Sequence, residues 1–241
     1  MRIYSAADLV KRSAAQIVYF RETGKKKEIT PMMLEGIEHQ KQCVQNLIAS
    51  TGGKVYEELG NRWIYFDCSG TENYIYFSVD AVGDKTLFEV KSLRMNEGEE
   101  FPQWYLESSI LQCVVYKSII NHVCSPHYGV WDAAGEMRGN DLGTMLLKTA
   151  KFRLDEGYAY EEVTVDPSWD YTLLFGNLAY SIKVENDYMV ISFLKKKIDA
   201  LTSYIMARAF DKEYKHREFE VLSEFFTYEQ IESPLLQMNK E

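Results

Sequence analysis

Hydrophobic positions recur at helical spacing in some segments of the chain and at strand spacing in the segments between them. Four segments have the helical pattern: residues 4–21, 31–50, 103–122 and 187–231. Ser5, with Asp8 three residues on, is a candidate N-cap of the first segment, and Thr30 followed by Pro31 is typical of a helix start. The pattern predicts a helix in each of these segments.

Short apolar and aromatic runs of strand length lie between these helices. They comprise residues 54–59, 62–68, 74–93, 127–133, 149–154 and 159–165, with weaker candidates at 172–177 and 180–184. A short helix is also expected within residues 125–148. Strands mixed with helices favour an α/β fold, in which a central mixed β-sheet is flanked by helices on both faces.

The length and organisation of the chain favour one domain. Its 241 residues suffice for one large domain, and no internal repeat, low-complexity segment or convincing linker divides them. We expect a single domain over residues 1–241, with its chemistry concentrated in about 30–122 and with residues 125–241 completing the fold.

Residues 74–93 resemble two strands joined by a tight turn, and three charged residues interrupt their apolar runs. These are Asp80, Glu89 and Lys91. Charges are seldom buried in strands unless another group pairs with them or coordinates them. Side chains alternate along a strand, so Glu89 and Lys91 share a face. A hydrolytic site with one or two metal ions would explain all three charges.

The length of the turn decides whether Asp80 joins that face. A two-residue loop of Asp84 and Lys85 places Asp80 directly opposite Glu89, whereas a loop of Gly83 and Asp84 places it one diagonal position away, on the same face. An odd loop without a bulge would separate them.

The other face of the hairpin is expected to form a core. Its members would be Ile75, Phe77, Val79, Ala81, Phe88 and Val90. The alternative, a buried ion pair between Lys91 and one carboxylate, leaves the second carboxylate unexplained.

The bulk chemistry of the chain limits the classes of function. A formal net charge of −9 argues against a protein that coats nucleic acid, but a metal ion can offset the acids of a nuclease site. No apolar run is long enough to cross a bilayer and no signal-peptide pattern is present, so we expect a soluble, cytoplasmic protein without a membrane partner. The four cysteines form no Cys-x-x-Cys pair, which disfavours a zinc ribbon.

The order of polar residues along the chain resembles a known family, the RecB-like and CRISPR-associated exonuclease branch of the PD-(D/E)XK nuclease superfamily. The matching positions are Gly36, His39, Asp80, Glu89-Val90-Lys91, Gln112 and Tyr116. The resemblance runs from Tyr4 to about Lys117. It implies a restriction-endonuclease-like fold.

The resemblance also implies roles for these residues. Asp80, Glu89, the backbone carbonyl of Val90 and His39 would bind Mg²⁺ or Mn²⁺, ions suited to oxygen ligands. Lys91 would orient the attacking water or stabilise charge in the transition state. A structural pairing of His39 with Glu35, four residues earlier, is the alternative.

Gln112 and Tyr116 are four residues apart, hence on one helical face, and would contact the phosphate or Lys91. Tyr116 is otherwise explained as a core residue. Related proteins with an iron–sulfur cluster carry a cysteine in the first helix and three after the Gln/Tyr helix. The first helix here lacks one and none follows Cys124, so no iron–sulfur cluster is expected.

The function expected from this resemblance is a metal-dependent DNA exonuclease acting on linear ends. Homo-oligomers or partners in repair or recombination are compatible with it. Two alternatives remain open: a structure- or sequence-specific endonuclease on the same fold, and a non-catalytic module that binds nucleic acid or protein.

Overall fold

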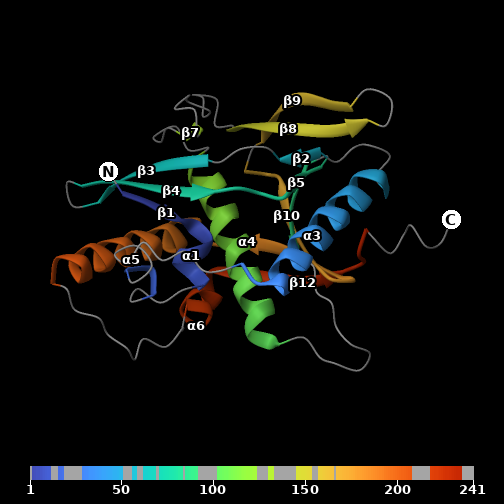
Figure 1. The fold of residues 1–241 in the computed structure, drawn as a ribbon. Coiled ribbons are helices and arrows are strands. Elements are labelled where there is room, and N and C mark those ends of the chain that lie inside the picture. The colour runs from blue at the N-terminus through green and yellow to red at the C-terminus, as the bar shows by residue number, and fades with distance from the viewer. Residues whose placement is uncertain are drawn as a thin grey trace.

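A computed structural model shows a mixed α/β protein with two sheets (Figure 1). It describes residues 2–11, 16–18, 29–50, 56–58, 62–68, 71–83, 85–91, 102–123, 130–132, 145–153, 157–165, 167–207 and 218–234.

The larger sheet has eight strands in the order β12-β11-β10-β6-β5-β2-β8-β9. Their bounds are β12 Phe226–Ile231, β11 Leu178–Val184, β10 Asp170–Phe175, β6 Thr86–Lys91, β5 Ala81–Val82, β2 Tyr56–Glu58, β8 Met145–Arg153 and β9 Gly157–Val165. β6 pairs in parallel with β10 and antiparallel with β5, so this sheet is mixed as expected. The prediction of a single central sheet is wrong, because a second sheet forms beside it.

The smaller sheet has four strands in the order β1-β4-β3-β7. Their bounds are β1 Arg2–Ser5, β4 Thr71–Phe77, β3 Arg62–Cys68 and β7 Val130–Asp132. β1 pairs in parallel with β4, and β3 pairs antiparallel with β4 and β7. The strand residues before Asp80 thus belong to one sheet and those after it to the other.

Helices cover both faces of the larger sheet. Their bounds are α1 Ala6–Lys11, α3 Pro31–Ser50, α4 Gln103–Val123, α5 Asp187–Ala207 and α6 Glu218–Leu222, followed by a 3₁₀ turn, Ser223–Phe225. On one face, Leu173 packs in a large core with α1, α4 and α5. On the other, Leu174 packs in a small core with Val44 and Leu47 of α3.

Helix α4 runs through the middle of the molecule (Figure 1) and packs against β10 and β11 of the larger sheet and against α1 and α5. Tyr116 of α4 contacts Phe77 of β4, with ring centroids 5.6 Å apart, and Tyr171 of β10, at 6.5 Å. Because α4 has sheet or helix on most sides, it can be apolar nearly all round, as its sequence is.

Both predicted helix caps are present. The Asp8 N–H donates to Ser5 Oγ at 3.4 Å, and the Met33 N–H donates to Thr30 Oγ1 at 3.2 Å. The first prediction needs one correction: Tyr4 lies in β1, so the helix begins at Ala6 rather than at residue 4.

The prediction of helix from Asp187 to Ile231 is right for α5 and wrong at its end. Residues 226–231 form β12, which pairs with β11 from Val184 to Ala179. Its aromatic and β-branched residues suit a strand, and the open edge of β11 supplies the hydrogen bonds that a helix would supply internally. The short helix expected within residues 125–148 falls largely outside the described residues.

None of the described helices combines the length and the hydropathy needed to cross a membrane.

Candidate active site

A two-residue loop joins β5 to β6. Val82 pairs with Leu87, and the Gly83 N–H donates to the Thr86 carbonyl at 2.7 Å. Lys85 has a φ of 59°, the left-handed conformation that such tight hairpin loops require. The even-length loop of Asp84 and Lys85 is therefore present, although Asp84 itself lies outside the described residues.

A β-bulge precedes β5. Phe88 is the pairing partner of Ala81, yet its carbonyl accepts a hydrogen bond from the Asp80 N–H at 3.0 Å. Two residues thus oppose one. The bulge shifts the alternation of faces, so Val79 packs in the large core and Ala81 in the small one. The predicted single core face is wrong: all six of its residues are buried, but they divide between two cores.

The Asp80 carboxylate lies beside β6, at the part of its edge that the two residues of β5 do not cover. Its Oδ2 accepts hydrogen bonds from the Val90 N–H at 2.8 Å and from Gln40 Nε2 of α3 at 2.9 Å. The carboxylate thus occupies the place of a neighbouring strand and satisfies a backbone donor that would otherwise be unpaired.

The Val90 carbonyl points to the same side as that N–H. The Lys91 carbonyl accepts from the Gly176 N–H at 2.9 Å beyond the other edge of β6, whereas the Phe88 carbonyl faces Asp80. Carbonyl directions alternate along a strand, so the Val90 carbonyl faces the Asp80 side. This is the direction that the predicted ligand role requires.

Glu89 extends from β6 toward α4 and is only 1% exposed. Its Oε1 accepts hydrogen bonds from Lys91 Nζ and from Gln112 Nε2, the latter at 2.6 Å. Its Oε2 is buried without a hydrogen-bond partner among the described residues. An uncompensated carboxylate oxygen in such a place is costly, which makes it a candidate for binding a cation.

Lys11 of α1 is the component that the sequence did not reveal. Its Nζ donates to Gln112 Oε1, so the Gln112 amide is held from both ends, by Lys11 and by Glu89. Gln112 Nε2 also lies 3.1 Å from the Tyr116 hydroxyl. The one sequence feature that could have identified Lys11 is its position directly after Leu9 and Val10, two apolar residues of a helical segment that are buried in the structure.

Burial and mutual repulsion alter the acid–base properties of this cluster. Burial, and then the neighbouring Glu89, raises the pKa of Asp80 to about 7, against the opposing effect of Lys91. Burial, and then Lys91, lowers the pKa of Lys11 to about 8. Burial alone would lower the pKa of Lys91, but Glu89 and Asp80 outweigh it and hold that pKa above its ordinary value. Two carboxylates and two ammonium groups give a formal charge of zero.

Tyr116 is a core residue whose hydroxyl lies at Gln112. It is 5% exposed, and burial raises its pKa well above the usual value. The structure thus brings Gln112 and Tyr116 together on one helical face, as predicted. The structure joins Gln112 to Glu89 rather than directly to Lys91.

His39 and Gly36, the two positions of the resemblance that precede Asp80, both lie on α3. His39 is half-buried on α3, and its Nδ1 is buried without a hydrogen-bond partner among the described residues. Its neighbour Gln40 is the residue that binds Asp80. A Cβ added to Gly36 would meet nothing within 4 Å, so no close contact there requires a glycine.

The donor set suits a divalent cation in part. No three His, Cys, Asp or Glu side chains of the described chain converge as a metal-binding group. However, Asp80, Glu89 Oε2 and the Val90 carbonyl are hard oxygen ligands of the kind that Mg²⁺ and Mn²⁺ prefer. A cation between the carboxylates would also offset the repulsion that raises the pKa of Asp80. The residues therefore fit such an ion, with His39 as a peripheral candidate.

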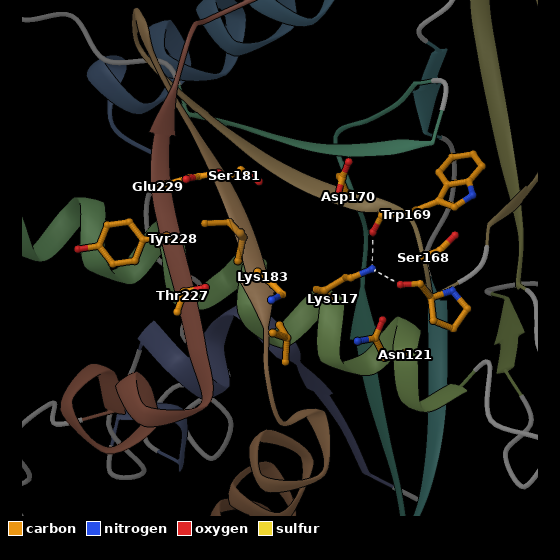
Figure 2. Close-up of a pocket in the computed structure, with 13 residues that line it drawn as sticks. Lys117, Asn121, Ser168, Trp169, Asp170, Ser181, Lys183, Thr227, Tyr228 and Glu229 are labelled. Carbon is orange, nitrogen blue, oxygen red and sulfur yellow. Dashed lines mark hydrogen bonds between the residues drawn. The ribbon is translucent and has the colours of Figure 1, made fainter.

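A cavity of about 580 Å³ lies elsewhere, against β10, β11 and β12. Figure 2 shows Lys117 of α4 pointing to the segment before β10, where Nζ donates to the Pro167 carbonyl at 2.6 Å and to the Trp169 carbonyl. These contacts fasten a turn to α4. None of the residues of the charged cluster lines this cavity, so the hollow and the cluster are separate features.

Comparison with protein-family models found no match, and comparison with curated proteins found none either. Among solved structures, the chain is similar to one described as "Crystal structure of SSO0001", with a TM-score of 0.42 and 14% sequence identity over 92% of this chain and 86% of that chain. At this level of similarity the likeness assigns neither a fold family nor an activity.

Proposed function

We propose that the protein is a metal-dependent DNA exonuclease with a restriction-endonuclease-like fold. The observation that supports it is the convergence of Asp80, Glu89 and Lys91 where β5 begins beside β6. Gln112, from a helix far along the sequence, reaches the same carboxylate. The order of these residues in the sequence resembles the PD-(D/E)XK nucleases, and their contacts agree with that resemblance.

Phosphodiester hydrolysis needs an activated water and stabilisation of the leaving group. A bound Mg²⁺ or Mn²⁺ would lower the pKa of its water and offset charge on the phosphate. Asp80, Glu89 Oε2 and the Val90 carbonyl would hold it. Lys91 keeps its charge at neutral pH, so its ammonium stabilises negative charge that develops on the phosphate.

Gln112 and Lys11 act through Glu89 in this proposal. The Gln112 amide donates to Glu89 Oε1, which leaves Oε2 as the oxygen available to a metal ion. Lys11 accounts for the orientation of that amide because it occupies Gln112 Oε1. Lys11 and Gln112 are therefore positioning residues.

One observation favours a second candidate, a non-catalytic nucleic-acid- or protein-binding module of the same fold. The two carboxylates and two lysines already balance in charge, and Glu89 pairs with Lys91. Such a pair can serve packing alone. The unpartnered Glu89 Oε2 argues for the enzyme, because a purely structural pair gains nothing by leaving a buried oxygen unsatisfied.

The test is cleavage of linear and circular DNA in Mn²⁺ or Mg²⁺ by the wild type, by Lys91→Ala and by Lys183→Ala as a matched control on an exposed lysine. The exonuclease predicts metal-dependent loss of linear DNA only, abolished in Lys91→Ala and retained in Lys183→Ala. Nicked circles would indicate an endonuclease instead. Folded wild-type protein that cleaves neither substrate in either metal refutes both enzymes.

A further inference from the structure

A second cavity, of about 390 Å³, opens between α1, α4 and α6. It is lined mostly by apolar and aromatic side chains, with Lys11 from α1, Trp104 and Tyr105 from the start of α4, and Phe219 from α6. Its volume lies within the range of about 300–1,000 Å³ that is typical of small-molecule sites. It is large enough to receive one flat aromatic group of a ligand.

This cavity adjoins the charged cluster of Lys11, Asp80, Glu89 and Lys91, because Lys11 belongs to both. Lys11 lines it and donates to Gln112, which in turn donates to Glu89. Tyr105 lines it too, and both Lys91 and Glu89 influence the pKa of its hydroxyl, which burial raises. If a nucleic acid bound with one phosphate at Lys91, the adjacent nucleotide would therefore lie at the mouth of this cavity.

The rim of the cavity carries an exposed aromatic platform. The Trp104 side chain is 68% exposed, and its ring meets Tyr105 edge to face, with centroids 5.6 Å apart. Tyr105 in turn contacts the buried Phe175, with centroids 5.4 Å apart. The indole is thus supported from beneath and open above. Nucleobases stack readily on exposed aromatic side chains of this kind.

The charges of the cavity favour a base over a run of phosphates. Lys11 is the only cation among the described lining residues. Of the two acids there, Glu218 is paired in the interior with Lys197 at 2.6 Å, and Glu107 accepts from Gln103 at 3.1 Å. The charges of the lining therefore give no net attraction for anions, and its apolar surface suits the face of a nucleobase.

We propose that this cavity binds a nucleobase of a single-stranded nucleic acid, the base next to the phosphate that Lys91 stabilises, by stacking on Trp104. The inference rests on the proposed nuclease function, which places the phosphate next to the bound base. Trp104 would set the preference for an unpaired strand, because a base enters the cavity only when it is free of a partner strand.

The experiment measures binding and not cleavage. A fluorescently labelled single-stranded DNA oligonucleotide and an abasic version of the same length are titrated with the full chain in EDTA, and anisotropy is recorded. The Trp104→Ala substitution should weaken binding of the ordinary oligonucleotide about tenfold, and Trp104→Phe should restore most of the affinity. Neither substitution should alter binding of the abasic strand.

Tyr188→Ala provides the matched control, because Tyr188 is 69% exposed at the start of another helix. Its neighbour Asp187 interacts electrostatically with His122, which lies near the other end of α4. His122 is about 27 Å along that helix from Trp104, so Tyr188 is remote from the second cavity. Tyr188→Ala should leave both affinities unchanged. An equal loss in Tyr188→Ala and Trp104→Ala would overturn the inference.

The inference and the proposed function can fail separately. Base-dependent binding through Trp104 without cleavage in any metal would support the base site and refute the nuclease. Cleavage by the wild type, with oligonucleotide affinity unaffected by Trp104→Ala, would refute the base site alone. An equal effect of Trp104→Ala on ordinary and abasic strands would also refute it, since stacking needs a base.

Discussion

Asp80 reaches Val90 because one extra residue is inserted before β5. The bulge lets the carboxylate point along the plane of the sheet and accept the Val90 N–H, while Glu89 extends toward α4. The two carboxylates are near enough for Glu89 to raise the pKa of Asp80, yet each has its own hydrogen-bond partners.

The titration of Asp80 predicts an unusual dependence of stability on pH. Its folded-state pKa, about 7, lies above the ordinary value of 3.8. The protonated carboxyl therefore favours folding at low pH, and this contribution is lost as the pH rises from about 4 to about 7. Asp80→Asn keeps an oxygen acceptor for Val90 and removes the titration.

In metal-free buffer, the free energy of unfolding of Asp80→Asn should therefore rise relative to the wild type by about 2–4 kcal/mol between about pH 4 and about pH 8. Urea unfolding at the two pH values measures this difference. A constant offset between variant and wild type at both pH values would contradict the prediction.

Lys11 balances the charge of the cluster and should oppose the binding of a cation. In Lys11→Met the formal charge of the four groups changes from zero to −1, so the affinity for Mn²⁺ should rise about tenfold. Calorimetric titration with Mn²⁺ measures the affinity, with Lys183→Met as the exposed control. An unchanged affinity would show that Lys11 is remote from the bound ion, and a weaker affinity would show that its support of Gln112 outweighs its charge; either result would contradict the prediction.

At the scale of elements, the β5–β6 hairpin sets the register of the site. Its loop holds Lys85 in the left-handed region, which costs a non-glycine residue about 1 kcal/mol. The same loop fixes Val82 opposite Leu87 and hence Asp80 near Glu89. The backbone strain at Lys85 therefore accompanies the strand pairing that brings Asp80 near Glu89.

Lys85→Gly should relieve that strain and stabilise the protein by about 0.5–1 kcal/mol, whereas Lys85→Val should destabilise it, because a β-branched residue tolerates a positive φ poorly. Equilibrium unfolding in urea distinguishes the three proteins. A Gly variant that is less stable than the wild type would mean that the Lys85 side chain contributes more than its backbone strain costs.

Helix α4 is the element that joins the two sheets to the site. Its buried middle packs between β4 and β10, and Gln112 on the same helix contacts Glu89. Its first turn carries Trp104 and Tyr105 beside the second cavity. One rigid helix thus aligns the carboxylate, its supporting amide and the aromatic platform.

At the scale of the whole molecule, metal binding should be visible as stability. An ion that binds only the folded state stabilises it by about 2.7 kcal/mol at a hundredfold excess over its dissociation constant. For a chain of 241 residues this corresponds to an increase in Tm of about 5–10 °C. Mn²⁺ should raise the Tm of the wild type and of Lys183→Ala, but not that of Glu89→Gln.

Scanning calorimetry in EDTA and in Mn²⁺ gives this comparison without any substrate. A similar increase in wild type and Glu89→Gln would place the ion elsewhere on the protein. Because the readout is thermal, it tests the metal site independently of cleavage.

Patterns confined to a few neighbouring residues were enough to predict much of this protein. The Thr30 cap, helix α4 and the short-loop hairpin all depend on contacts within a few positions, where backbone geometry leaves few choices. The loop of Asp84 and Lys85 was among the predicted alternatives. The predicted pairing of Asp80 directly opposite Glu89 is wrong, because the bulge places Asp80 against Phe88. Gln112 entered only through resemblance, because no local rule links residue 112 to residue 89.

The remaining features depend on contacts between distant segments. The division of residues 74–91 between two sheets, the strand β12 and the contact of Lys11 with Gln112 each require a partner remote in sequence. The bulge at Asp80 involves Phe88 of the same hairpin, but the pattern of apolar residues did not predict it. A strand edge such as that of β11 can override local helical pattern, and a buried lysine is recognisable only once its acceptor is in place. Local periodicity therefore determined which elements form and where the charges lie on them, whereas long-range packing determined which of those charges meet.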